Sequence, residues 1–307
     1  MNSELLQQLT ALDAAGFLIT GNEDAGQFLK RVEAVKAVYA EFEAELADRK
    51  KVKVFDLFEV DQESRITPEI AEEAAGITGR LYGFKVSHVP GFFLKRQIGW
   101  LWGGCLIGDP EVNFAVFLLR NAFRRKRRFL NYRREELLAH ELCHAVHHVM
   151  DEPQLEEYFA YQTSPSPLRR YLGNCFISDR DAWGFLLPVM LLPVAELIRA
   201  LWLPGFPSWI FWILAAVYPL FLLCRNHFSR RLVRIARRNL LAAGVKNPDA
   251  VLFRCLLSEI RELKAMPAGN IRQWIDDKAA ESLRHLVIKQ RFFCENEEPV
   301  EEGYEEK

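Results

Sequence analysis

The stretch His140-Glu141-Leu142-Cys143-His144 lies inside a run from Arg133 to Met150 whose pattern predicts one helix. Residues four apart on an α-helix lie one above the other on the same face, so the two imidazoles point the same way and can share a zinc ion. Glu141 is next to the first histidine and can reach a water bound to that metal. The alternative is a helix that carries two histidines without a metal.

A catalytic zinc site needs three protein ligands and one open position, so a third ligand has to be found. His148 lies eight residues beyond His140, about 12 Å along the helix axis, too far for the side chains to converge. A second element must therefore supply the ligand. Pro153 suits the first position of a new helix, and an antiparallel return places Glu157 near His144, where its side chain can close the gap.

This arrangement resembles the gluzincin branch of the zincin metallopeptidases, in which HExxH is followed by a glutamate ligand on a second helix. In that branch the ligand often opens a Glu-x-Phe-Ala or Glu-x-x-Ala sequence, and Glu157-Tyr158-Phe159-Ala160 fits both forms. The match favours Glu157 over Glu156 as the ligand. The resemblance implies zinc (Zn2+) as the cofactor and Glu141 as the general base, with the metal ligands His140, His144 and Glu157.

Two features depart from the gluzincin pattern. Twelve residues separate His144 from Glu157, fewer than in the best-known members, and Tyr161 stands where the branch often has an Asp. A carboxylate outside the ligand set orients a zinc histidine in many such sites, and Tyr161 cannot supply one here. Tyr161 lies one turn beyond Glu157, and we expect it either to pack in the core or to donate a hydrogen bond to a ligand or an oxyanion.

Other residues near the motif are expected to have structural roles. The metzincin pattern fails, because His147 and Met150 stand where it requires Gly and His. His147 and His148 are expected on the helix surface or in the core. Cys143 points away from the paired histidines and is expected to be a small buried hydrophobe.

Residues 1–175 are predicted to form an α+β, zincin-like catalytic domain. Gluzincin-like domains place a small sheet before the active-site helix and bind extended peptide along its edge strand. Val112–Arg120 is the strand candidate immediately upstream of the motif. Further predicted elements are the strands Val52–Val60 and Tyr82–Val89 and the helices Leu5–Leu12, Glu23–Ala47 and Pro68–Gly76, the last with Thr67 as its N-cap.

The charge balance argues against a nucleic-acid-binding protein. Arg124-Arg125-Lys126-Arg127-Arg128 is the strongest basic cluster, and it suits nucleic acid or an anionic membrane, but such a run is more commonly a solvated loop. The chain has 40 basic and 41 acidic residues and a formal charge of −1. Residues 294–307 include seven glutamates and predict a disordered acidic tail.

Two apolar stretches predict a transmembrane helical hairpin over residues 182–224. Ala182–Leu203 and Phe206–Cys224 have 22 and 19 residues, close to the roughly 20 needed to cross a bilayer. Tryptophans cluster around the short turn between them, as expected at a membrane interface: Trp202, Trp209 and Trp212. The alternatives are a hairpin that dips into one leaflet, given Pro188 and Pro193 and the Glu196 and Arg199 pair, and a core hairpin of a soluble protein.

Arginines on both outer flanks of the hairpin predict its orientation. They occur before Ala182 and again from Arg225 onward, whereas the turn has no Lys or Arg, so both ends are expected in the cytoplasm. Six cysteines without a CxxC pair or framework spacing are expected to be reduced thiols there. The sequence thus predicts a multi-pass protein of the cell membrane with its catalytic domain facing the cytoplasm.

Residues 225–293 are predicted to form a helical carboxy-terminal region. Arg225–Leu241 predicts a basic helix suited to anionic headgroups, followed by the helices Asn247–Ala265 and Asn270–Phe293. None of these carries a recognisable chemical motif.

The sequence therefore predicts a membrane-anchored zinc metallopeptidase that hydrolyses peptide bonds, with a peptide or protein substrate and the lipid bilayer as partners. Two other functions remain as alternatives. The protein could be a membrane-bound regulatory or scaffold protein with a zincin-like binding domain, or a zinc hydrolase of a non-peptide substrate. Glu141 together with a third ligand favours an enzyme, because a binding module can lose either.

Overall fold

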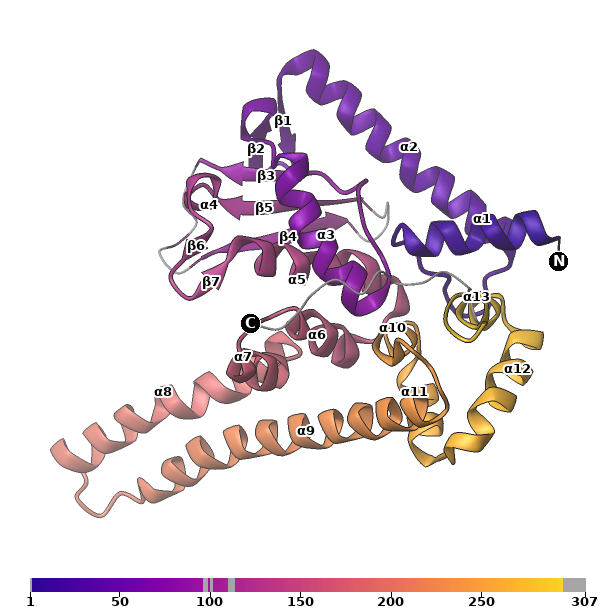
Figure 1. The fold of residues 1–307 in the computed structure, drawn as a ribbon. Helices are drawn as coiled ribbons and strands as arrows, with labels where there is room; N and C mark the ends of the chain where they lie inside the picture. Colours follow the sequence, from indigo (N-terminus) through magenta and orange to yellow (C-terminus); the bar gives the residue numbers. More distant parts are fainter. Residues whose placement is uncertain (1, 96–98, 100–101, 110–113, 295–307) are drawn as a thin grey trace, which may run out of the picture.

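The computed structural model describes residues 2–95, 99, 102–109 and 114–294. Its architecture is α+β and mostly helical, as predicted, and its described strands form three small sheets. Figure 1 shows the sheets and amino-terminal helices on one side of a long helical hairpin, whose second helix leads to the carboxy-terminal helices. The predicted acidic tail lies outside the described residues from position 295 onward.

The largest sheet has three described strands in the order β3 (Gly91–Leu94), β5 (Phe114–Arg120) and β4 (Gly104–Asp109). β3 is parallel to the central strand β5, and β4 is antiparallel to it. Val116–Arg120 is fully buried, as a strand covered on both faces should be. The predicted strand Val112–Arg120 is thus confirmed from Phe114, and its first two residues lie outside the described part.

The predicted strand Tyr82–Val89 is wrong. Helix α3 runs from Pro68 to Tyr82, further than the predicted Pro68–Gly76, and Gly83 ends it in the left-handed conformation at φ 69°. The strand that joins the sheet begins only at Gly91. The apolar residues between them, Phe84 and Val86, still enter the core, but from an irregular segment.

The predicted strand Val52–Val60 is two strands. β1 (Lys51–Val54) and β2 (Phe58–Asp61) pair antiparallel. Phe55 and Asp56 adopt left-handed φ values of 51° and 56° between them, so the chain reverses inside the predicted strand. No glycine marks this turn, which is why the sequence pattern misses it. A further short hairpin joins β6 (Arg128–Phe129) to β7 (Tyr132–Arg133).

The amino-terminal helices agree with the prediction. α1 (Ser3–Ala14) and α2 (Ala25–Arg49) each match the predicted bounds within two residues at both ends. Asp24 explains where α2 begins, because its side chain accepts from the Gln27 N–H at 2.8 Å and the Gln27 side chain bonds back, which forms a capping box. The helices between the sheet and the hairpin are α4 (Ala122–Arg125), α5 (Arg134–His147), α6 (Pro153–Gln162) and α7 (Pro167–Leu172).

The predicted apolar hairpin consists of α8 (Asp179–Leu201) and α9 (Trp209–Ala242). Both helices are long and apolar enough to span a membrane, and only 6% and 11% of their most apolar windows are buried. A core hairpin of a soluble protein would show the reverse. Glu196 and Arg199 pair at 3.5 Å, as expected.

Helix α9 is longer than predicted, because the second apolar stretch and the basic helix Arg225–Leu241 are one continuous helix. Asp181 of α8 pairs with Arg225 of α9 at 2.7 Å where the hairpin meets the rest of the molecule. Beyond this point α9 buries Val233, Ala236 and Leu240 in the core. The hairpin is therefore connected to the core by one helix.

Each of the two predicted carboxy-terminal helices is interrupted. The structure has α10 (Pro248–Leu252), α11 (Leu257–Ala265), α12 (Ile271–Glu281) and α13 (Leu283–Phe292) in their place. Ser282 separates the last pair, because its backbone is extended at φ −134° and ψ 127°.

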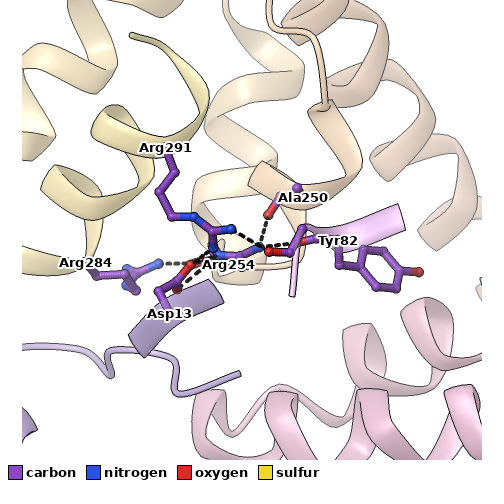
Figure 2. A network of polar contacts seen from close by, with 7 residues as sticks. Asp13, Tyr82, Ala250, Arg254, Arg284 and Arg291 are labelled. Carbon is purple, nitrogen blue, oxygen red and sulfur yellow. Dashed lines mark hydrogen bonds and ion pairs between the residues drawn. The ribbon is translucent and has the colours of Figure 1, made fainter. Parts of the chain in front are cut away.

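These carboxy-terminal helices share one hydrophobic core with α3, α5 and α6. The buried Arg254 donates hydrogen bonds to both carboxylate oxygens of Asp13, at 3.1 and 2.9 Å, and to the carbonyls of Tyr82 and Ala250 (Figure 2). Arg291 of α13 also contacts Asp13. Since Asp13 lies in α1, the first and last helices of the described chain fold together.

Candidate metal centre

Helices α5 and α6 bring the motif and the downstream glutamates together. A short 3₁₀ turn continues α5 to Met150, and Asp151 then reverses the chain in the left-handed conformation at φ 52°. α6 starts with Pro153 in its first turn, which confirms the predicted stop and restart. The two helices pack against each other, with Cys143 of α5 and Phe159 of α6 in the same core.

The predicted ligand atoms converge. Nε2 of His140 lies 3.1 Å from Nε2 of His144, and Oε1 of Glu157 lies 3.8 Å from the same His144 nitrogen. One ligand atom from each of the three residues lies within 4.8 Å of the others, and all three residues are half-buried. A tetrahedral zinc ion with ligand bonds of about 2.0–2.1 Å holds neighbouring ligand atoms about 3.3 Å apart. The observed spacing is therefore close to what such an ion requires.

Glu156 faces the other side of the same imidazole. Its Oε1 lies 2.6 Å from Nδ1 of His144, so it contacts the nitrogen opposite the one that faces His140 and Glu157. This geometry separates the two adjacent glutamates, because only Glu157 points to the shared space. Glu156 is therefore placed to orient the His144 ring. The sequence has Tyr161, not an Asp, at the position where a carboxylate for this role was expected.

The outer hydrogen bonds direct both imidazoles toward this space. The Ala160 backbone accepts a hydrogen bond from the His140 ring, and the Glu156 carboxylate accepts one from Nδ1 of His144. The two Nε2 atoms then face each other at 3.1 Å, within hydrogen-bond distance, so that a proton on the His144 nitrogen can be donated to the neutral His140 ring. A metal ion could take the place of this proton, because both nitrogens can act as ligands once they are unprotonated.

Burial sets the charges of these groups. Burial and the neighbouring His144 ring lower the pKa of His140 to about 3, so that ring is neutral at pH 7. Burial also lowers the pKa of His144, but the hydrogen bond to Glu156 and the charges of Glu141 and Glu157 outweigh it and raise that pKa. Burial raises the pKa of Glu157. A bound divalent cation would lower the pKa values of both His144 and Glu157, because it favours neutral histidine and ionised carboxylate.

Glu141 is buried beside the centre, with 9% of its surface exposed. Its Oε2 accepts a hydrogen bond from the backbone N–H of Leu106 in β4 at 2.9 Å. Burial raises the pKa of this carboxyl, which brings it nearer to the range that a general base needs. The Leu106 contact was not predicted, since β4 itself has no clear sequence signal.

β4 is an edge strand within the described part of the sheet. The Arg120 N–H donates to the Gly103 carbonyl, so the backbone groups of Cys105 and Ile107 also face β5 by alternation. Those of Gly104, Leu106 and Gly108 consequently face away from the sheet. One of these outward groups is the N–H that Glu141 holds.

Cavities lie near both ends of β4. One of about 210 Å³ touches Gly103 and Gly104 and is lined by His140, Glu141 and Tyr161. The other, also about 210 Å³, touches Gly108 and is lined by the segment after α1, by one face of α2 that includes Arg31 and Tyr39, and by residues that follow His144. The His140–His144 motif thus has a cavity near each end of β4.

Tyr161 and Arg169 line the first cavity. The Tyr161 ring stands edge-on to the His140 ring at 4.6 Å, and burial raises its pKa to about 12, so the phenol keeps its proton at neutral pH. This position fits a hydrogen-bond donor as well as a packing role. Arg169 pairs with the buried Glu136 at 2.9 Å. No sequence signal predicted Arg169, because it lies in the separate helix α7.

The remaining candidates have structural roles, as predicted. His147 is fully buried and packs against the rings of Phe159 and Phe253. Cys143 is fully buried, and His148 is exposed at the end of the helix. None of the three joins the described ligand cluster.

No protein-family model, curated protein or solved structure matches this chain.

Proposed function

We propose that His140, His144 and Glu157 bind a zinc ion and that the protein is a membrane-anchored zinc metallopeptidase. The observation that carries the proposal is the convergence of three ligand atoms on the space beside the buried carboxylate of Glu141. No further His, Cys, Asp or Glu of the described residues joins this cluster, so the fourth coordination position of a bound zinc ion would stay open. Three ligands with one open position are characteristic of catalytic rather than structural zinc.

A zinc ion in this site supplies Lewis acidity, which polarises a substrate carbonyl and acidifies a water. Glu141 acts as the general base, because its Oε2 is held by the Leu106 N–H while its other oxygen is free to accept the proton of the attacking water. The same carboxyl then delivers that proton to the leaving amine. Glu156 and the Ala160 backbone keep both imidazoles turned toward the metal.

An extended peptide is the substrate that suits the surroundings of the site. The outward backbone groups of Gly104 and Gly108 can pair with a peptide strand on either side of the Leu106 N–H that bonds Glu141, and the cavities near the two ends of β4 have room for side chains of the peptide. Glu141 contacts Leu106 in the middle of β4, so a peptide that pairs with this strand passes next to Glu141. This favours peptide hydrolysis over a scaffold role or a non-peptide substrate.

The hairpin supports a location at the cell membrane. α8 and α9 expose the apolar surface that would face lipid. The arginines on the outer flanks favour a cytoplasmic position for both ends and hence for the metal centre.

The test uses the full-length protein purified in a neutral detergent. Wild type should contain one zinc per chain by elemental analysis and should cleave peptides from a proteome-derived library. His140→Ala should lose the metal, whereas Glu141→Gln should keep the metal and lose turnover by orders of magnitude. His227→Ala, which changes an exposed histidine of α9, is the matched control and should resemble wild type.

Equal zinc content in wild type and His140→Ala would refute the metal site. Undiminished cleavage by Glu141→Gln would refute the mechanism. Bound zinc without cleavage of any peptide by wild type would favour the scaffold or the non-peptide hydrolase.

A further inference from the structure

A groove of about 810 Å³ lies between α9 and α11, with Gln154 of α6 at its side, and none of the candidate metal ligands lines it. Phe221, Phe228 and Ile235 line it from α9, and Leu257 lines it from α11. The α9 residues recur every three to four positions or a multiple of this, so they follow one face of the helix. Phe228 is 65% exposed, which is costly in water for a side chain of this size.

Unpaired cations surround this apolar surface. Arg231, Arg261 and Lys264 all line the groove and are exposed, and none has an acidic partner among the described residues. A fourth cation, Arg225, also lines it but is held by Asp181. No Asp or Glu lines the groove in the described structure. The groove therefore combines an apolar floor with a positive edge, which is complementary to an anionic amphiphile.

The groove is continuous with the surface that would face lipid. It begins at Phe221 and Cys224, in the last turns of the apolar part of α9. Arg231 follows Cys224 by seven residues, about 10 Å along the helix. The headgroup region of a bilayer is roughly 5–8 Å deep on each side, so in a tilted α9 this arginine lies near the phosphates.

We propose that this groove binds one anionic phospholipid of the surrounding leaflet. An acyl chain would cover Phe221 and Phe228, and the phosphate would accept hydrogen bonds from Arg231, Arg261 and Lys264. Because α11 belongs to the carboxy-terminal region, the bound lipid would attach that region to the membrane surface. The proposal is independent of the metal centre and requires only that the hairpin lies in a bilayer.

The experiment measures lipid binding by native mass spectrometry on the full-length protein in a neutral detergent, titrated with phosphatidylglycerol or phosphatidylcholine. Wild type should bind one phosphatidylglycerol at least ten-fold more tightly than phosphatidylcholine. The variant Arg231→Gln/Arg261→Gln/Lys264→Gln should weaken phosphatidylglycerol binding on the order of 100-fold, since each cation near anionic lipid contributes about five-fold.

The matched control is Arg124→Gln/Arg125→Gln/Lys126→Gln, which removes the same charge from an exposed cluster at α4, none of whose residues lines the groove. It should change phosphatidylglycerol binding by less than two-fold. Equal weakening in both triple variants, or none in the groove variant, would overturn the proposal.

A second arm separates a lipid from free phosphate. Phe228→Ser removes apolar contact without changing charge, and it should weaken phosphatidylglycerol binding several-fold. Millimolar inorganic phosphate should not displace the lipid. Displacement by phosphate together with unchanged binding in Phe228→Ser would show a free-phosphate site and would refute a lipid site.

Discussion

Glu156 and Glu157 are adjacent in the sequence, yet they face opposite nitrogens of the His144 ring. Glu156 Oε1 lies 2.6 Å from Nδ1, whereas Glu157 Oε1 lies 3.8 Å from Nε2, on the side where His140 also points. Successive side chains of a helix are about 100° apart, so a ring inserted between them can touch both. In the proposed zinc site, Glu157 would bind the metal and Glu156 would orient its ligand His144.

We expect the two glutamates to respond differently to removal of charge. Glu157→Gln removes a ligand and should nearly abolish zinc binding, whereas Glu156→Gln should weaken it by about 10–100-fold through the loss of the orienting hydrogen bond. Zinc retained against a graded series of chelators measures both. A larger loss in Glu156→Gln than in Glu157→Gln would reverse the assigned roles.

His88 provides a pH-dependent contribution to stability at a distance from the metal ligands. Its ring stacks on Phe17 at 4.3 Å and meets the edge of Tyr39, and burial together with the charge of Lys36 lowers its pKa to about 4. The unfolded chain therefore binds this proton more readily than the folded one. Stability from neutral His88 is present above pH 6.5 and is lost as the pH falls toward 4.

We therefore expect His88→Phe, which keeps an aromatic ring against Phe17, to reduce the loss of stability between pH 6.5 and pH 4. The difference between wild type and variant should reach about 3 kcal/mol at most over that range. Chemical unfolding followed by tryptophan fluorescence at each pH gives the two curves. Parallel curves would show that His88 is not buried as a neutral ring.

At the scale of elements, the position of β4 decides what the motif helix faces. Among the described strands β4 pairs only with β5, so the Leu106 N–H is left to bond Glu141 while the neighbouring residues hold the sheet. The same pairing leaves Gly104 and Gly108 facing outward near the two cavities. A strand in the middle of the sheet would have no backbone group for the carboxylate.

Amide hydrogen exchange tests this register inside one strand. In wild type the amides of Cys105 and Ile107 should exchange slowly because they bond to β5, and that of Leu106 should be slowed by Glu141 alone. Glu141→Ala should accelerate exchange at Leu106 at least ten-fold and leave Cys105 and Ile107 within about two-fold. Uniform acceleration along β4 would indicate that the strand has loosened and that the assigned register is not supported.

At the scale of the whole molecule, the first and last helices of the described chain, α1 and α13, fold together. The buried carboxylate of Asp13 in α1 pairs with Arg254 and Arg291, so residues after the hairpin complete the amino-terminal half (Figure 2). The hairpin leaves this core and returns to it at the Asp181 and Arg225 pair. A chain that ends before Arg225 should therefore not fold into the structure described.

Asp13→Asn should be strongly destabilising, because it leaves the guanidinium of Arg254 buried without its counter-charge. Removing one partner of such a pair costs about 3–5 kcal/mol. Denaturant unfolding of the purified protein measures the loss. Glu59→Gln breaks the exposed pair with Lys51 and is the control, which should leave the free energy of unfolding nearly unchanged. A similar effect in both variants would exclude a special role for the buried network.

The orientation of the hairpin can be mapped with a membrane-impermeant thiol reagent in intact cells, in a background without the native cysteines. Cysteines at Ser3 and Lys246 should be protected, and one at Gly205 should react because it lies exposed in the turn between α8 and α9. Gly205 is a better probe than Ser208, which is buried. Protection at Gly205 would favour a hairpin within one leaflet, and labelling at Ser3 would contradict a cytoplasmic metal centre.

The sequence by itself predicted the features that depend on neighbours along the chain. The motif helix, the restart at Pro153, the helices α1 and α2 and the apolar hairpin all follow from periodicity, capping residues and composition within about 30 residues. The three candidate ligands and the candidate base could also be predicted from local sequence, because all four lie within 18 consecutive positions, from His140 to Glu157.

Tertiary structure alone decided how these elements meet. The pairing of β4 with β5, the separate roles of Glu156 and Glu157 and the contact between Asp13 and Arg254 join residues through space, and the last pair is 241 positions apart. Local pattern carries no information on such contacts, because the register of a strand and the direction of a side chain depend on which distant surface buries them. The same reason explains the two strands predicted wrongly, whose apolar residues enter the core from a hairpin and from an irregular segment.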